Sequence, residues 1–143
     1  MLIRKENANM SELKFLSPIT AEQLTTLNGA LTLTDVGAAT KILVRTGSET
    51  AAATYLSTPF GCSREIIDGV LVCGTRPDEW TLYAAPEMAN EVIETIPEEG
   101  FVTVLDITHG RAMIRISGSC SSLALAKVCN IDFVVEIKSR KQD

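Results

Sequence analysis

The only histidine of the chain, His109, is the first candidate for acid–base chemistry. It lies between Thr108 and Gly110 in the stretch 106–118, where a short corner precedes an alternation of apolar and polar residues. Histidine suits proton transfer because its ordinary pKa lies close to neutral pH. A nucleophilic site also needs a base partner and an oxyanion donor, and the sequence identifies neither. We therefore interpret His109 as a structural residue that hydrogen-bonds a neighbouring turn.

A fainter copy of this stretch occurs earlier in the chain. Asp35 is followed twelve positions later by Gly47, Asp106 is followed twelve positions later by Gly118, and a serine comes after each glycine. Such internal similarity predicts two related strand–helix units. The aspartates are expected to bind backbone amides of the turns that follow them. The amides after each glycine could hold an anion, but no glycine-rich phosphate motif accompanies them, which favours ordinary helix capping.

The cysteines and the segment 78–80 are interpreted as structural, and their pattern predicts no metal centre. The four cysteines, Cys62, Cys73, Cys120 and Cys129, form no Cys-x-x-Cys pair, and their apolar or helical surroundings predict buried thiols. Asp78 is expected in a polar turn, and Trp80 is expected to be a packed indole.

Secondary-structure patterns alternate along the chain and predict an α+β fold with a mostly antiparallel sheet and helices packed on one side. Thr20 could cap a short helical turn, and Ser48 and either Ser119 or Ser121 are expected to cap later helices. The run 70–73 is uniformly apolar, which predicts a strand buried on both faces. The expected strands are 31–35, 41–45, 70–73, 79–83, 101–105, 111–117 and 131–137, and the expected helices are 51–56, 86–96 and a segment ending near residue 128.

These elements predict an N-terminal arm over 1–28 and one α+β domain over 29–143. Within the domain, 31–97 forms a first unit and 101–137 an incomplete second unit. An incomplete unit leaves an open sheet edge and an apolar face, which partners usually cover. Phe133, Val135 and Ile137 are therefore predicted to lie at an interface.

Composition narrows the function classes. The 143 residues carry a net charge of −5, which argues against binding to nucleic acid, since that requires a basic surface. No apolar run reaches the ~20 residues of a membrane-spanning helix, and the N-terminus lacks the pattern of a secretory signal. A cytoplasmic location is expected.

Three segments in order, 74–83, 106–118 and 125–133, resemble a known family. Gly-Thr-Arg-Pro-Asp-Glu-Trp-Thr-Leu-Tyr, with Asp78 and Trp80, is similar to a Gly-Pro-Asp-Glu-Trp-Leu-Leu segment of the gamma subunit of heterotetrameric sarcosine oxidases. The stretch from Asp106 through His109 to Gly118 resembles that family's Asp-Val-Ser-His-Arg…Gly signature. Leu-Ala-Lys-Val-Cys-Asn-Ile-Asp-Phe, with Asp132, resembles its Leu-x-Lys-Gly-Cys-x-x-Asp-Leu.

The resemblance implies an accessory, non-catalytic subunit of a cytoplasmic complex that oxidatively demethylates a secondary amine such as sarcosine. Its partners would be alpha- and beta-type flavoprotein subunits. Those partners would hold flavin, NAD and tetrahydrofolate, and this chain alone would bind no cofactor.

The gamma family is similar in turn to the folate-binding domain of glycine-cleavage aminomethyltransferases, which implies two related β-α-β units. A gapless match places Ala84 where that family has a functional asparagine, and Glu91 where it has a catalytic acidic residue. Glu91 is thus a second candidate catalytic residue beside His109. The alternative function is a small folate-binding or folate-dependent one-carbon transfer protein.

Overall fold

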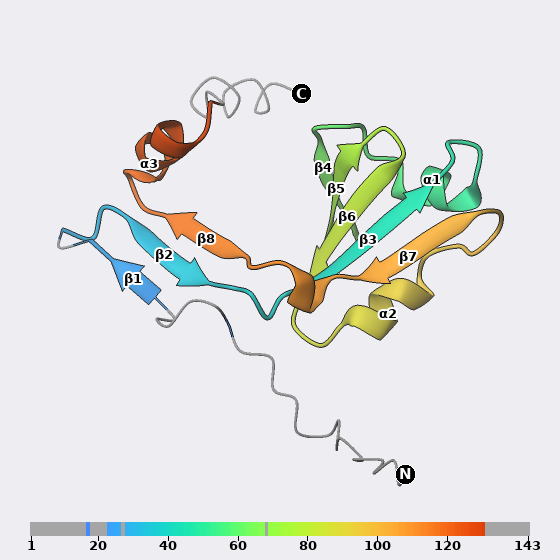
Figure 1. Cartoon of the computed structure of the whole chain (residues 1–143), viewed down its shortest axis with the longest axis horizontal. Coiled ribbons are helices and arrows are strands. Elements are labelled where there is room, and N and C mark those ends of the chain that lie inside the picture. Colours follow the sequence, from blue (N-terminus) through green and yellow to red (C-terminus); the bar gives the residue numbers. More distant parts are fainter. Residues whose placement is uncertain (1–16, 18–22, 27, 68, 131–143) are drawn as a thin grey trace, which may run out of the picture.

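The computed structural model describes residues 17, 23–26, 28–67 and 69–130, and in these it is an α+β fold with two antiparallel sheets and three α-helices (Figure 1). In chain order the elements are β1 (Gln23–Thr25), β2 (Thr32–Asp35), β3 (Thr40–Thr46), α1 (Ala51–Leu56), β4 (Ser63–Ile67), β5 (Val70–Arg76), β6 (Glu79–Ala84), α2 (Ala89–Glu94), β7 (Val102–Asp106), the 3-10 turn η2 (Thr108–Gly110), β8 (Ile114–Ser117) and α3 (Ser121–Val128).

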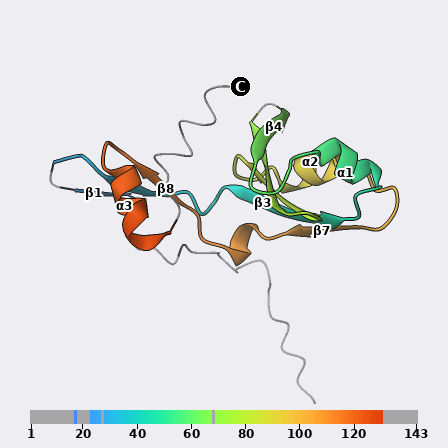
Figure 2. The ribbon, with the colours of Figure 1, turned by 90° about the horizontal axis from the view of Figure 1, so that it is seen from above.

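The larger sheet has the strand order β4-β5-β6-β3-β7, and α1 and α2 lie on the same face of it (Figure 2). Its interior strand β3 alternates, so that Ile42 and Val44 are fully buried against the helices. Burial of apolar area of this kind contributes about 25 cal/mol per Å². The core consists of buried aliphatic residues and one indole: Ile42, Val44, Ala52, Ala53, Leu56, Val70, Val72, Trp80, Leu82, Ala84, Val92 and Ile96.

The β5–β6 hairpin forms as the sequence predicts. Arg76 pairs with Glu79, so Pro77 and Asp78 make the connection. Proline suits the first central position of such a turn because its φ is already fixed. The hairpin places Trp80 in the core, where its indole Nε1 donates to the carbonyl of Thr58 at 2.8 Å.

The prediction that the run 70–73 is buried on both faces is wrong. Burial alternates along β5, and Leu71 is 42% exposed. The reason is that helices cover only one face of this sheet, so every second side chain of β5 points away from the core.

The helices differ from prediction at their ends. Thr50, and not Ser48, caps α1, since its hydroxyl accepts from the amide of Ala53 at 3.2 Å. The helix predicted over 86–96 begins only at Ala89, because Glu87 has a left-handed φ of 67° that no α-helix contains. Cys120 precedes α3 without a side-chain cap, so neither predicted serine caps that helix.

The smaller sheet has the order β1-β2-β8 and is associated with α3 (Figure 1). The described residues therefore form two sheets where a single one was expected, and α3 does not share the face that α1 and α2 cover. Gln23 and Leu24 belong to β1, which overturns the predicted helical turn at this point; pairing with Thr34 and Leu33 of β2 fixes them as strand.

The two copies of the repeated stretch cross between the sheets in opposite directions. The first runs from β2 in the smaller sheet to β3 in the larger, and the second runs from β7 in the larger to β8 in the smaller. Asp35 pairs with Ile114, and Asp106 pairs with Ile42, so the copies are reciprocally related. The predicted strand 131–137 lies outside the described residues, and the predicted domain boundaries stay a prediction.

Candidate functional site

The crossing point of the two copies brings together three of the polar residues that the sequence singles out, Asp35, Asp106 and His109. Asp35 Oδ1 accepts from the amide of Gly37 at 2.8 Å, and Asp106 Oδ1 accepts from the amide of Thr108 at 2.8 Å. Each aspartate thus closes a short turn with the residue two positions ahead, as expected of aspartates at strand ends.

Lys41 joins the two turns from the start of β3. Its side chain is only 2% exposed. The Nζ amine donates to the carbonyl oxygens of Gly37 at 2.7 Å, Ala39 at 2.9 Å and Thr108 at 2.9 Å. Its backbone amide donates to Thr108 Oγ1 at 3.0 Å, and its carbonyl accepts from Ile107 at 2.9 Å. All three ammonium protons therefore have acceptors within the chain.

Electrostatics at the junction follow from these contacts. Hydrogen bonding by the Ser17 side chain, then by the Gly37 amide, holds the pKa of Asp35 below its ordinary value. Hydrogen bonds from the side chain and backbone of Thr108 do the same for the pKa of Asp106. Burial lowers the pKa of Lys41, an effect that the charges of Asp106 and Asp35 oppose.

Chemically, this junction resembles a structural clamp more than a reaction centre. A nucleophilic lysine needs a free electron pair that faces a substrate. The amine of Lys41 is instead enclosed and directed at three backbone carbonyls. A buried ammonium held by several acceptors fixes the relative position of the segments that supply them.

His109 lies beside this clamp on η2 and is exposed. Its charge contributes to the lowered pKa of Asp106. The histidine turn connects β7 to β8, so its place in the fold agrees with a corner residue between two strands. The strands end at Asp106 and resume at Ile114, which is a wider corner than the predicted strands 101–105 and 111–117 imply.

Glu91, the other candidate catalytic residue, is far from the junction in sequence and lies exposed in the first turn of α2. An acidic side chain at this position interacts favourably with the helix dipole, which accounts for a glutamate there. Ala84, the position that corresponds to a functional asparagine in the aminomethyltransferases, is buried at the end of β6.

The other predicted motif residues are spread over the fold. Asp78 accepts a hydrogen bond from the Thr46 amide through its carbonyl, at 3.1 Å. A Cβ at Gly47 would meet the Glu49 carboxylate, and one at Gly118 would meet the carbonyl oxygen of Ala30. The structure thus brings Asp35 and Asp106 together and leaves Asp78, Gly47 and Gly118 apart from them. Asp132, Phe133, Val135 and Ile137 lie outside the described residues.

Two residues that the sequence did not single out make several hydrogen bonds to backbone carbonyls. Lys41 is one; its only signal is a charge within the β-rich run 40–46, at the end nearest the repeated aspartate. Arg64 is the other. Its guanidinium donates to the carbonyls of Tyr55 at 2.7 Å and Leu56 at 3.0 Å, so it caps the C-terminus of α1 from the neighbouring strand.

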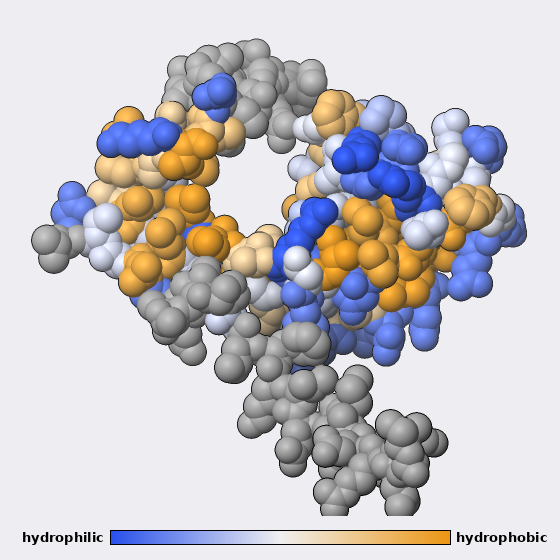
Figure 3. Space-filling view, viewed as in Figure 1, coloured by the Kyte–Doolittle hydropathy of each residue, from blue (hydrophilic) through white to orange (hydrophobic). Residues whose placement is uncertain are grey.

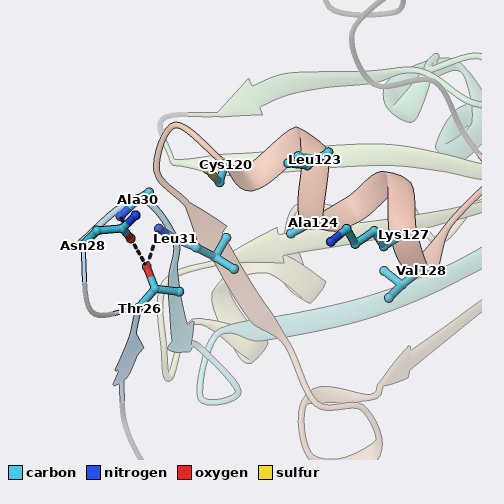
Figure 4. A pocket seen from close by; sticks show the side chains of 9 residues that line it. All are labelled: Thr26, Asn28, Ala30, Leu31, Cys120, Leu123, Ala124, Lys127 and Val128. Atoms are coloured by element: carbon cyan, nitrogen blue, oxygen red, sulfur yellow. Dashed lines mark hydrogen bonds between the residues drawn. The ribbon is translucent and has the colours of Figure 1, made fainter.

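A pocket of about 460 Å³ lies between α3 and the β1–β2 hairpin (Figure 4). Its wall is mainly aliphatic, with the ammonium of Lys127 as the charged group. The hairpin side is ordered by Thr26, whose Oγ1 donates to Asn28 Oδ1 at 2.9 Å and accepts from the Leu31 amide at 3.2 Å.

The cysteines are not the buried thiols that the sequence predicted. Cys62 is exposed, and Cys73, Cys120 and Cys129 are partly exposed. Cys120 and Cys129 flank α3 at its two ends, where packing is incomplete. Among the described residues, no group of three or more His, Cys, Asp or Glu side chains is placed to hold a metal ion. Within the same part of the chain, no helix is long and apolar enough to cross a membrane.

Comparison with known proteins gives a likeness of fold. The structure is similar to a chain of the heterotetrameric sarcosine oxidase from Corynebacterium sp. U-96, in a complex with pyrrole 2-carboxylate, with a TM-score of 0.61 and 22% sequence identity. The match covers 71% of this chain, which spans 57% of that one. No family model and no curated protein matches the sequence. The fold relation to sarcosine oxidase that the sequence predicted is thereby supported, without fixing a subunit.

Proposed function

We propose that this chain is an accessory, gamma-type subunit of a sarcosine-oxidase-like complex that oxidatively demethylates a secondary amine. The observation that carries the proposal is the likeness of fold to a chain of a heterotetrameric sarcosine oxidase. The first two segments that resemble the gamma subunit lie on the β5–β6 hairpin and on the crossing from β7 to β8, and the described part of the third, 125–130, lies at the end of α3. Fold and motifs therefore support the same family.

The polar junction supports an accessory role. The charged side chains at this junction bind the backbone of the two turns: Asp35 and Asp106 accept from amides, and Lys41 donates to carbonyls. These hydrogen bonds stabilise the crossing of the two copies. In this proposal the flavin, NAD and tetrahydrofolate of the complex belong to alpha- and beta-type partners, and this chain contributes assembly rather than chemistry.

Purification of the tagged chain from its native host tests the proposal. We expect flavoprotein partners in fixed stoichiometry and bleaching of the flavin absorbance when sarcosine or a related N-methyl amine is added without oxygen. Recovery of the chain without any flavoprotein, over a range of concentrations and salt, would refute it. Titration of the isolated chain with tetrahydrofolate tests the alternative function in one-carbon transfer. That alternative predicts binding that is lost when Glu91 is replaced.

A further inference from the structure

The internal repeat allows each strand to be compared with its counterpart. Ile42 of β3 pairs with Asp106, and Ile114 of β8 pairs with Asp35, so by strand pairing Ile114 takes the place of Ile42 in the second copy, one residue beyond the position that equal spacing from the aspartates would give. Two residues further on, Ile116 takes the place of Val44. Equivalent positions therefore carry branched apolar side chains in both copies, which indicates that both are built to be covered.

Their environments differ sharply. Ile42 is 0% exposed, whereas Ile114 is 49% exposed. The free edge of β3 is occupied by β6, which runs antiparallel and places Leu82 opposite Ile42 and Trp80 opposite Val44. β8 is the last strand of its sheet, and among the described residues no strand pairs with its outer edge. Within residues 69–130, the second copy thus shows no counterpart of β6.

Apolar surface continues from this edge onto α3. Leu123 is 62% exposed and Val128 is 82% exposed, and both line the pocket beside the β1–β2 hairpin. Figure 3 shows apolar side chains gathered over the smaller sheet and α3. An open strand edge next to contiguous apolar surface is the arrangement that binds an added strand.

The charges around the outer edge of β8 indicate which kind of strand would bind there. The segment 107–130 carries Arg111, Arg115 and Lys127 and contains no aspartate or glutamate, although the whole chain has a net charge of −5. Arg115 lies on β8 itself, and Lys127 lies in the last turn of α3. Complementary charge selects partners and speeds their association, so acidic residues on the incoming strand are favoured.

We propose that the outer edge of β8 binds a β-strand of a partner protein. The strand runs antiparallel to β8, places large apolar residues two positions apart opposite Ile114 and Ile116, and carries carboxylates near Arg115. Its role is that of β6 beside β3 in the first copy. This inference rests on the proposed function for the existence of a complex, and it specifies where and how the chain docks.

Photo-crosslinking in the complex isolated through the full tagged chain tests the register. We place p-benzoylphenylalanine at position 114 or at position 116, in separate preparations, and map the linked peptide by mass spectrometry. We expect one partner segment in both cases, with the residue linked from 116 lying two positions N-terminal to the residue linked from 114. Ile114→Lys should weaken association at least tenfold, whereas Phe101→Lys, at a residue that is 85% exposed just before β7 of the other sheet, should leave it unchanged.

The outcomes separate the inference from the proposed function. Links to residues 131–143 of the same chain, links to a second copy, links without the antiparallel offset, or no links to a partner would each overturn the inference. Equal weakening by Ile114→Lys and Phe101→Lys would also overturn it. Links in the expected register to a partner that holds no flavin would support the strand site and refute membership of an amine oxidase complex.

Discussion

At the scale of single residues, Lys41 decides how the two copies of the repeat meet. Its amine binds two carbonyls of the first turn and one of the second, while Thr108 binds its backbone amide. The desolvation cost of a buried ammonium is offset only when its protons are satisfied in this way. Lys41 therefore fixes the joint between the sheets.

Replacement of Lys41 by methionine, which keeps an unbranched stem but removes the amine, should destabilise the fold by about 2–4 kcal/mol, because three carbonyl oxygens lose their donor in a buried place. Lys127→Met on the exposed surface of α3 is the matched control and should change the free energy of unfolding by less than about 0.5 kcal/mol. Urea denaturation followed by circular dichroism measures both. A loss of equal size in the two variants would contradict the clamp.

The clamp also predicts a pH dependence. Burial lowers the pKa of Lys41 from its ordinary value of 10.5, so the unfolded chain binds this proton more tightly than the folded chain. The free energy of unfolding should therefore rise as the pH increases toward 10.5, where the unfolded state also loses the proton. The difference in stability between the natural chain and Lys41→Met should widen with pH. A constant difference between neutral pH and 10.5 would show that Lys41 keeps its ordinary pKa, and a shrinking one would show that folding raises that pKa.

The aspartates of this joint were predictable and the lysine was not. Asp35 and Asp106 stand before turn-forming residues, and an aspartate can satisfy a backbone amide two positions ahead without any tertiary contact. Two of the acceptors of Lys41 lie nearby in the chain, but the third, Thr108, lies far away in sequence. Only the pairing of β3 with β7 brings that carbonyl to it.

At the scale of elements, α1 depends on a cap that comes from another element. Arg64 of β4 donates to the carbonyls of Tyr55 and Leu56 and to the Ser57 hydroxyl at 3.1 Å. Arg64→Ala should cost about 1.5–3 kcal/mol, the usual contribution of hydrogen bonds from a charged donor. Chemical denaturation and hydrogen exchange of the α1 amides measure the loss globally and locally.

Arg45→Ala is the control for that experiment, because Arg45 is also an exposed strand arginine but its guanidinium binds a carboxylate and not the carbonyls of a helix end. Its guanidinium pairs with Glu79 at 2.9 Å, yet its side chain is 49% exposed. Such a surface pair contributes about 0–1 kcal/mol. An equal loss for both arginines would mean that Arg64 acts only as a surface charge.

The turn between β8 and α3 depends on a glycine. Gly118 has φ of 105°, and a Cβ there would meet the carbonyl of Ala30, which also accepts from the Cys120 amide at 2.9 Å. Gly118→Ala should cost about 3 kcal/mol or more, from backbone strain together with displacement of the β1–β2 hairpin. Gly29→Ala, at φ of 69° with open space around it, isolates the strain alone and should cost about 1 kcal/mol. Thermal unfolding of both variants measures the difference, and equal losses would exclude the close approach.

The sequence predicted well those elements that local signals define. It predicted poorly the features that depend on pairing between distant strands. The helix over 51–56 and the β5–β6 hairpin follow from alanine content and from Pro77, which act within a few residues. The division into two sheets depends instead on β2 pairing with β8 and β3 pairing with β7. No local pattern distinguishes those pairings from a single continuous sheet.

At the scale of the whole molecule, the fold combines a covered half and an uncovered one. The larger sheet has α1 and α2 on one face and contains nearly all of the buried core, whereas the smaller sheet and α3 expose apolar residues (Figures 2 and 3). A molecule of this form gains stability when its uncovered half is bound, because a partner that binds only the folded state shifts the unfolding equilibrium. Assembly and stability are therefore expected to be coupled.

An accessory role makes a last prediction about turnover by the assembled complex. A side chain that transfers protons usually contributes a factor of about 10²–10⁴ to the rate. His109 is exposed on η2 beside Asp106, and its place at the corner between β7 and β8 accounts for it structurally. His109→Ala and Glu91→Gln should therefore each leave the turnover number of a fully assembled complex within about twofold of the natural value. Steady-state oxidation of sarcosine, measured per mole of flavin after size-exclusion chromatography, separates chemistry from loss of assembly. A hundredfold fall in turnover for His109→Ala, with assembly intact and with a changed pH profile, would make the histidine catalytic and would refute the accessory role.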